Sequence, residues 1–259
     1  MNIRKYGQAP FNVAVLHGGP GAPGYMAPVA RELSKTMGVL EPLQTKDSLK
    51  GQIDELDEQL TDHADPPVIL IGSSWGAVLA LFLAGRRPSL IKKLILVGSA
   101  VFDAESSSQT ESNRLSRLTE ENLEKYEQIR LELRLAPPDR RGDLMKEWGK
   151  LLDESDMYDP LTADLEVIDT QYHIFERVWP GFVALRDKPG FLKEEFSHIK
   201  CPVVVIHGEY DPHPIEGIRP FLEECLDDVR FYILPECGHY PWIERRARED
   251  FFKVLKDEI

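Results

Sequence analysis

The chain has 259 residues with 31 basic and 44 acidic side chains, so its formal net charge is −13 at pH 7. A surface of this sign repels nucleic-acid backbones and anionic membranes, so we expect neither as a partner. The longest apolar run, residues 77–84, is far shorter than a membrane-spanning helix. Cys201, Cys225 and Cys237 are odd in number and lack zinc-ligand spacing. We therefore expect a cytoplasmic protein with no metal, no cofactor and no disulfide framework.

Short runs of aliphatic and aromatic residues recur along the chain and predict β-strands. Because the runs are continuous rather than alternating, they are typical of strands covered on both faces, as in a parallel sheet. A weaker candidate at residues 38–45 is interrupted by Pro42. The five clear strands are residues 13–16, 68–71, 94–97, 203–206 and 231–234.

Helical patterns lie between these strands. Residues 49–60 carry one apolar stripe, residues 75–86 are apolar nearly all round, and residues 243–255 repeat an apolar side chain every four positions. Alternation of strands and helices predicts a doubly wound, mostly parallel α/β sheet.

Residues 102–198 contain no convincing strand and predict a helical insertion between two sheet strands. Thr119, followed by two glutamates, is typical of a helix N-terminus. Ser106–Ser108 suggest a flexible start to the insertion. The helices expected within it cover residues 123–133, 144–152, 162–169 and 172–178. We predict a core made of residues 1–101 and 199–259, with residues 102–198 as a helical cap.

Residues 72–76 read Gly-Ser-Ser-Trp-Gly and stand between a predicted strand and a predicted helix. A nucleophile elbow has this context, because the chain turns sharply there and holds its central serine in strained geometry. The flanking glycines remove side chains that would clash. The pattern alone arises by chance in roughly one chain of this length in fifteen. Its position therefore carries the prediction that Ser74 is a nucleophile.

Residues 17–21 read His-Gly-Gly-Pro-Gly and directly follow a predicted strand. Such a loop can present a bare backbone N–H to a substrate oxygen. We assign the donors of an oxyanion hole to the N–H groups of Gly19 and of Trp75, which follows the nucleophile. No Lys-Ser or Lys-Thr pair follows, which disfavours a phosphate loop.

Asp211 and His239 each follow a predicted strand. Loops at the carboxyl ends of parallel strands gather at one edge of the sheet, so both side chains can meet Ser74 there. A histidine can take the proton of a serine hydroxyl, and a carboxylate can orient that histidine. Asp103 remains an alternative acid and His213 an alternative base.

These motifs together resemble the α/β-hydrolase superfamily over nearly the whole chain. Residues 17–21 resemble the HGGPG signature of proline iminopeptidase-type hydrolases, and the elbow with Trp75 is similar to theirs. The resemblance implies an α/β-hydrolase fold with a helical cap, and Asp211 and His239 as the partners of Ser74. Barely ten residues precede the first clear strand, so we expect the family's amino-terminal hairpin to be missing or reduced.

We expect a serine hydrolase that cleaves an ester or amide bond of a small-molecule substrate through an acyl-enzyme. Trp148, Phe175 and Trp179 are candidates to line its substrate pocket, and packing between cap and sheet is the competing explanation for all three. The resemblance also implies a proline iminopeptidase-like aminopeptidase, although no acidic cap residue is assigned by motif to a substrate amino terminus. A non-catalytic binding protein and a carbon–carbon hydrolase or lyase also remain open, as does the oligomeric state.

Overall fold

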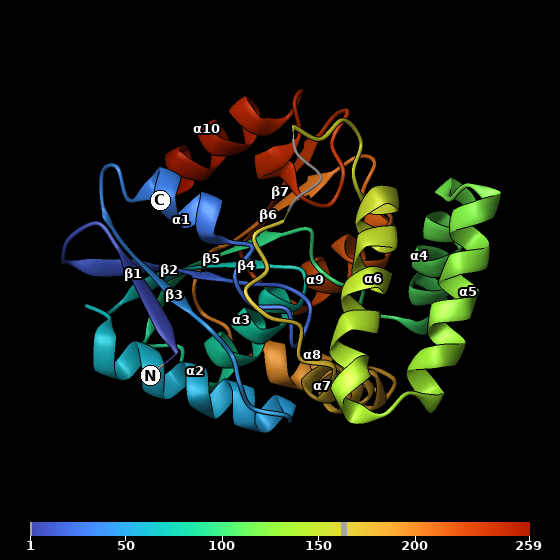
Figure 1. Ribbon diagram of the computed structural model, residues 1–259. Helices are drawn as coiled ribbons and strands as arrows, with labels where there is room; N and C mark the ends of the chain where they lie inside the picture. The colour runs from blue at the N-terminus through green and yellow to red at the C-terminus, as the bar shows by residue number, and fades with distance from the viewer. Residues whose placement is uncertain (1, 162–164) are drawn as a thin grey trace.

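The computed structural model describes residues 2–161 and 165–259. Its centre is a seven-stranded sheet in the order β1-β3-β2-β4-β5-β6-β7 (Figure 1). Strands β2 to β7 pair in parallel, whereas β1 pairs with β3 in the antiparallel direction at one edge. The strands are β1 (Ile3–Tyr6), β2 (Phe11–Leu16), β3 (Gly38–Pro42), β4 (Val68–Ser73), β5 (Ile91–Val97), β6 (Val203–Gly208) and β7 (Val229–Leu234). The predicted doubly wound, mostly parallel sheet is confirmed.

Ten α-helices are described between and after these strands. They are α1 (Ala27–Leu33), α2 (Leu49–His63), α3 (Trp75–Arg86), α4 (Ala104–Arg117), α5 (Glu120–Leu135), α6 (Pro138–Asp156), α7 (Tyr172–Arg186), α8 (Phe191–Phe196), α9 (Arg219–Cys225) and α10 (Arg248–Glu258). Two short 3-10 helices, η1 (Ile215–Gly217) and η2 (Pro241–Ile243), lie in the loops after β6 and β7.

Each face of the sheet has its own hydrophobic core, because successive side chains of a strand point to opposite faces. In β2, Ala14 and Leu16 belong to the core formed with α2 and α3, whereas Val13 and Val15 belong to the core formed with α1 and α10. Figure 1 shows α1 and α10 on one side of the sheet and α2 on the other. Burial on both faces explains why the strands are continuously apolar in sequence.

The amino-terminal hairpin is reduced to a single strand. Strand β1 reads Ile-Arg-Lys-Tyr, and no strand precedes it within the described residues. Arg4 Nε and Tyr6 Oη of β1 both donate to Oε2 of Glu41 in β3, each at 2.8 Å. A short edge strand therefore forms here, in which Arg4 and Tyr6 are held by the carboxylate of the neighbouring strand.

Helices α4 to α8 lie between β5 and β6 in the chain, and α5 and α6 share a small core of their own. Thr119 caps α5 by accepting a hydrogen bond from Asn122 N at 3.2 Å, as its position predicts. By contrast, helices α7 and α8 contribute Ile174, Phe182 and Phe196 to the hydrophobic core that the sheet forms with α2 and α3. The exact boundaries of a cap at residues 102 and 198 stay a prediction.

Two local predictions within this segment are wrong. Ser106–Ser108 are not a flexible start but lie in α4, because Asp103 caps that helix through a 2.7 Å bond from Ser106 N. Residues 165–169 are not helical, because the chain bonds to the glycine-rich loop instead, from Ile168 N to Pro23 O at 2.9 Å. Residues 162–164 of that predicted helix lie outside the described residues.

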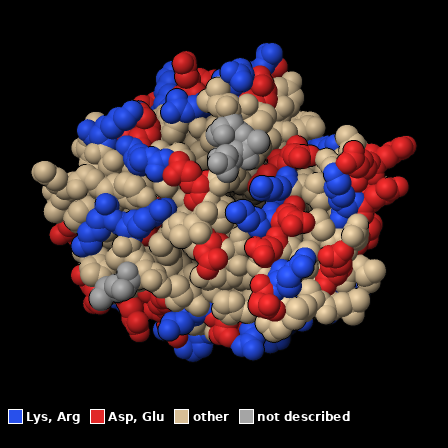
Figure 2. All heavy atoms as spheres, in the orientation of Figure 1, with Lys and Arg blue, Asp and Glu red and all other residues tan. Residues whose placement is uncertain are grey.

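Charged side chains of both signs are mixed over the face drawn in Figure 2, and neither sign covers it alone. Some of the ion pairs join the segment between β5 and β6 to the rest of the chain, as Arg31 does with Glu166 and Arg177 with Asp47. On this face, the net negative charge does not form a patch of a single sign.

Candidate active site

Ser74 lies at a sharp turn between β4 and α3. Its backbone angles are φ 51° and ψ −114°, a region that residues with a side chain rarely occupy. The turn is tight: a Cβ atom on Gly72 would lie 2.3 Å from the carbonyl oxygen of Gly76. Glycine at position 72 therefore permits the turn that lifts Ser74 away from the sheet, as the motif predicts.

Ser74 and His239 line the same cavity, which has a volume of about 540 Å³. Its size is that of a small-molecule site. The remaining lining residues that the sequence indicated are Gly19, Trp75, Trp148, Phe175, Trp179 and His213. The cavity thus brings together side chains from the sheet edge and from the segment between β5 and β6.

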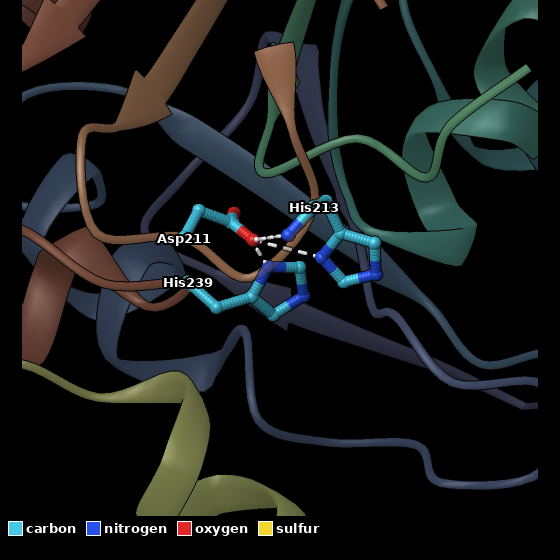
Figure 3. A group of neighbouring side chains, drawn as sticks. All are labelled: Asp211, His213 and His239. Carbon is cyan, nitrogen blue, oxygen red and sulfur yellow. Dashed lines mark hydrogen bonds and ion pairs between the residues drawn. The ribbon is translucent and has the colours of Figure 1, made fainter. Parts of the chain in front are cut away.

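Asp211 is buried and hydrogen-bonded to His239. The ring donates from Nδ1 to Oδ2 of Asp211 at 2.7 Å (Figure 3). The two loops are joined through their backbones as well, because Tyr210 N donates to Cys237 O at 2.8 Å. The 2.7 Å length of the bond between the His239 ring and the Asp211 carboxylate is typical of charge-assisted hydrogen bonds. The ring nitrogen opposite Nδ1 points away from Asp211, as Figure 3 shows.

The electrostatics of this pair suit a histidine base. Burial alone would raise the pKa of Asp211, but the imidazoles of His239, His207 and His213 hold it well below its ordinary value. Burial alone would lower the pKa of His239, but the adjacent carboxylate raises it above its ordinary value. Asp211 therefore stays ionised and favours a protonated His239, the state that forms when the ring takes a proton.

Asp103 is not at this site. It is exposed and serves as the cap of α4, where its carboxylate accepts the N–H of Ser106. Of the two candidate acids, the structure brings Asp211 to His239.

His213 is at the site, and it contacts Asp211 as closely as His239 does. Its Nδ1 donates to Oδ1 of Asp211 at 2.7 Å, and its backbone N donates to the same oxygen at 3.0 Å. The rings of His213 and His239 stack with centroids 4.7 Å apart. Burial lowers the pKa of His213 to about 4, so this ring is neutral near pH 7.

The predicted oxyanion donors, Gly19 and Trp75, line the same cavity as Ser74. Trp75 is the first residue of α3, where a backbone N–H has no partner within the helix. Among the described residues, neither Trp75 N nor Gly19 N donates to another protein atom. The Trp75 side chain is fixed by a 2.8 Å bond from its Nε1 to Gln52 Oε1. Within the described part of the chain, both N–H groups therefore lack a partner, one at the start of a helix and the other in a glycine-rich loop.

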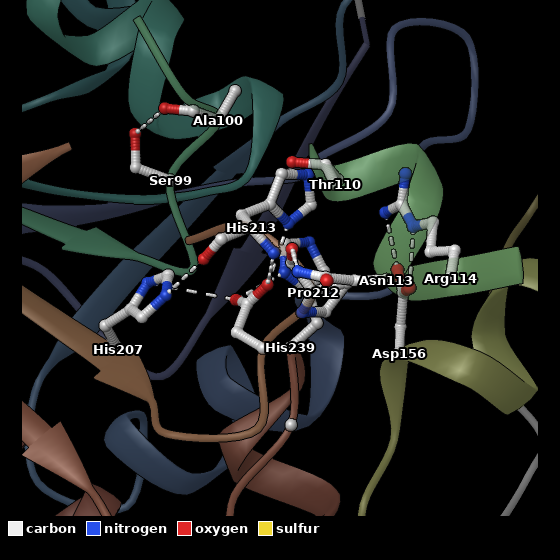
Figure 4. Close-up of polar contacts among 12 residues, drawn as sticks. Ser99, Ala100, Thr110, Asn113, Arg114, Asp156, His207, Pro212, His213 and His239 are labelled. Atoms are coloured by element: carbon white, nitrogen blue, oxygen red, sulfur yellow. Dashed lines mark hydrogen bonds and ion pairs between the residues drawn. The ribbon is translucent and has the colours of Figure 1, made fainter. Parts of the chain in front are cut away.

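An acidic group from α6 forms another wall of the cavity, and sequence reasoning did not find it. Asp153 accepts a 2.8 Å hydrogen bond from Tyr240 Oη, and burial raises its pKa to about 7. Asp156 binds Arg114 of α4 through two bonds of 2.7 and 2.6 Å (Figure 4). All four residues line the cavity. Asp153 and Asp156 are three residues apart in sequence, so they lie on the same face of α6, but the sequence does not indicate which part of the protein that face contacts.

The end of α6 is tied to the loop that carries His239. His239 N donates to Asp156 O at 2.7 Å. The buried carboxylate of Glu244 accepts from Gly238 N at 3.0 Å and from Tyr158 N at 2.8 Å. The backbone around His239 is therefore held by the segment that follows α6.

Asp211, His213 and His239 also form a group that could hold a metal, since one potential ligand atom of each lies within 4.8 Å of the others. Both Nδ1 atoms, however, already hydrogen-bond to Asp211 at 2.7 Å. The arrangement is accounted for by a hydrogen-bonded network, without an ion. Among the described residues, no helix combines the length and apolar character needed to cross a membrane.

Comparisons with known proteins agree with this architecture. The chain is similar to a pimeloyl-[acyl-carrier protein] methyl ester esterase of Chromobacterium violaceum, with 24% identity over 99% of this chain and 97% of the relative. It is similar to serine hydrolase BPHL of Mus musculus, with 24% identity over 73% of this chain and 54% of the relative.

Solved structures with similar folds include VinJ, with a TM-score of 0.69 and 20% identity, and a proline iminopeptidase of Mycobacterium smegmatis, with a TM-score of 0.64 and 19% identity. Both alignments cover 99% of this chain and 93% of the other. The model of the alpha/beta hydrolase family matches residues 15–253, nearly the full length. The chain therefore belongs to the alpha/beta hydrolase family.

Proposed function

We propose that the protein is a serine hydrolase that cleaves an ester bond of a small substrate through an acyl-enzyme on Ser74. The observation that carries this proposal is that Ser74, on its strained turn, faces the same cavity as a histidine whose Nδ1 is held by a buried carboxylate. A nucleophile, a base and an orienting acid are the set of groups that a Ser-His-Asp hydrolase uses for this chemistry.

The geometry supports a role for each group in this proposal. Because His239 donates from Nδ1 to Asp211, its neutral ring carries a lone pair on Nε2, which takes the proton of the Ser74 hydroxyl. The Ser74 oxygen then attacks the acyl carbon, and the N–H groups of Gly19 and Trp75 stabilise the developing oxyanion. The same ring gives the proton to the leaving alcohol. Water, activated by His239, then releases the acid and restores Ser74.

An ester of a medium-sized acyl group is the substrate class that the cavity supports best. Trp148 and Phe175 lie edge to face with ring centroids 5.7 Å apart and form an apolar wall. Trp179 lines the cavity too, but it also packs on Trp75 and Phe182, so part of its surface belongs to the core. The similarity to a methyl ester esterase, over nearly the full length of both chains, also favours an ester.

A proline iminopeptidase-like aminopeptidase is the second candidate, and one observation favours it. Arg114 forms an ion pair with Asp156, whereas Asp153, which also lines the cavity, has no ion-pair partner among the described residues. A substrate ammonium group beside Asp153 would lower its pKa from about 7 and be bound as an ion pair. The likeness in fold to a proline iminopeptidase is compatible with this alternative.

The test uses Ser74→Ala and a substrate panel. We expect the variant to lose labelling by a fluorophosphonate and to lose hydrolysis of p-nitrophenyl esters by roughly 10⁴- to 10⁶-fold, while its circular dichroism spectrum is unchanged. Undiminished labelling of the variant would refute Ser74 as the nucleophile. Turnover of proline aryl amides alone would favour the aminopeptidase, and stoichiometric binding without product would indicate a binding protein.

A further inference from the structure

The carboxylate of Asp211 accepts hydrogen bonds from two imidazole rings, one at each oxygen. His239 donates to Oδ2 at 2.7 Å, whereas His213 donates to Oδ1 from its ring at 2.7 Å and from its backbone at 3.0 Å. Figure 3 shows both rings on the same side of the carboxylate. Of these contacts, only the bond from His239 is required by the proposed reaction. The contacts of His213 therefore call for a separate explanation.

The structure holds His213 firmly in this position. Its carbonyl oxygen accepts a 2.9 Å bond from His207 Nε2, and the preceding carbonyl of Pro212 accepts a 2.8 Å bond from Asn113 Nδ2 of α4 (Figure 4). Its ring stacks on His239 at an interplanar angle of 30°. The loop that carries Asp211 is thus fixed by the sheet on one side and by α4 on the other.

A buried carboxylate needs donors on both oxygens. Without the His213 ring, Oδ1 of Asp211 would keep only the 3.0 Å bond from the His213 backbone N–H, and a carboxylate oxygen held by that single donor could turn more freely about the last side-chain bond. Rotation would take Oδ2 out of line with Nδ1 of His239. Donation by His213 removes this freedom and leaves Oδ2 to His239 alone.

We propose that His213 is a positioning residue that sets the plane of the Asp211 carboxylate and thereby the orientation of His239. This inference rests on the proposed function, in which Asp211 orients the base. His213 acts as a neutral donor: its Nδ1 carries the proton and its ring stays uncharged near pH 7. The competing role, that of the base itself, fits poorly, because a neutral ring so reluctant to take a proton is a weak base.

Three substitutions at one position separate the donor from the bulk of the ring. His213→Asn places an amide N–H where Nδ1 stands and keeps the donor. His213→Gln is the matched polar control, because its longer side chain carries the amide beyond that point. His213→Leu keeps most of the volume and removes the donor. Each variant is assayed on a p-nitrophenyl ester, with kcat divided by the fraction of protein that a fluorophosphonate labels.

We expect His213→Leu and His213→Gln to lower kcat by about 10- to 100-fold, the effect of losing one hydrogen bond to a charged acceptor, with KM changed by less than about threefold. His213→Asn should restore kcat to within about threefold of the parent. The downfield proton resonance of the His239–Asp211 bond should persist in His213→Asn and weaken in His213→Gln. If His213→Leu does not fold, the pair of amide variants decides.

The outcomes distinguish this inference from the proposed function. Parental kcat in both His213→Gln and His213→Leu would overturn the positioning role, while loss of labelling in Ser74→Ala would leave the proposed function intact. Equal losses in His213→Asn and His213→Gln at equal thermal stability would also overturn it. If His239→Asn kept turnover and His213→Asn abolished it, His213 would be the base and the inference would be wrong.

Discussion

The sheet edge and the segment between β5 and β6 meet at one cavity, but they are built differently. At the edge, Ser74, Asp211 and His239 stand on short loops that leave buried strands, and backbone bonds join neighbouring loops. The opposite wall comes from helices whose cavity-facing side chains also form their own small core, as Trp148 does. Rigid strands fix the proposed catalytic groups, whereas helices that pack largely on one another are free to differ in what they present to a substrate. We therefore expect the chemistry to reside in the first region and the choice of substrate in the second.

The largest loss of activity is expected from a substitution at the sheet edge, at the proposed acid Asp211. Asp211→Asn should lower kcat by about 10⁴-fold, because an amide cannot hold His239 in the tautomer needed to accept a proton. Asp103→Asn is the matched control: we expect parental kcat and little change in the free energy of unfolding, since asparagine caps a helix about as well as aspartate. Steady-state kinetics and thermal melts check both. A large kinetic loss in Asp103→Asn would reverse the assignment of the acid.

A change in the helical wall should affect binding more than chemistry. Phe175→Ala should raise KM for a long-chain p-nitrophenyl ester by about tenfold, the value of one partly buried aromatic contact, and leave kcat for the acetate ester near parental. Leu131→Ala is the control, because Leu131 is exposed and lies outside the cavity. Equal losses on short and long esters would show that the helical wall takes part in the chemistry.

The pH dependence of kcat/KM tests the proposed base at the sheet edge. His239 must be unprotonated to act as a base, and its pKa is raised by Asp211, so kcat/KM should rise with pH along a limb whose midpoint lies above 6.5, the ordinary value for histidine. In Asp211→Asn the residual activity should show this limb at lower pH, because the charge that favours the imidazolium is gone. A limb below 6.5 in the parent protein would contradict the buried ion pair.

The smallest effect is expected at Asp153. In the folded protein its pKa is raised to about 7 from an ordinary value of 3.8, so the wild type loses stability as pH rises through that window. Asp153→Asn keeps an acceptor for Tyr240 and has no proton to lose. The difference in Tm, variant minus wild type, should therefore be a few degrees larger at pH 8 than at pH 4. Glu147→Gln, exposed on the same helix, is the control and should show no such trend.

The sequence predicted the sheet edge better than the segment between β5 and β6. The turn at Ser74 is local, since glycine at position 72, a strand before it and a helix after it are all visible in the chain. Asp211 and His239 could be placed because parallel strands deliver their loops to one edge. Strand β1 was not predicted, because its four residues carry no apolar pattern and depend on the partner strand β3 for their hydrogen bonds.

The rest depends on long-range contacts that no spacing records. His213 was weighed as a rival base, but its bond to Oδ1 of Asp211 depends on how the loop folds back after β6. Asp153 and Arg114 come from different helices, and each faces the cavity because of how α4 and α6 pack. The predicted helix fails at residues 165–169 because the glycine-rich loop supplies other partners for that backbone.

The bond from His239 N to Asp156 O has a consequence for how substrates arrive. It joins the base to the last residue of α6, and Glu244 secures the backbone on both sides of that contact. An outward movement of this end of α6 would therefore displace the backbone that carries the proposed base. We therefore expect ligands to enter and leave the cavity by routes that do not require the carboxyl end of α6 to move.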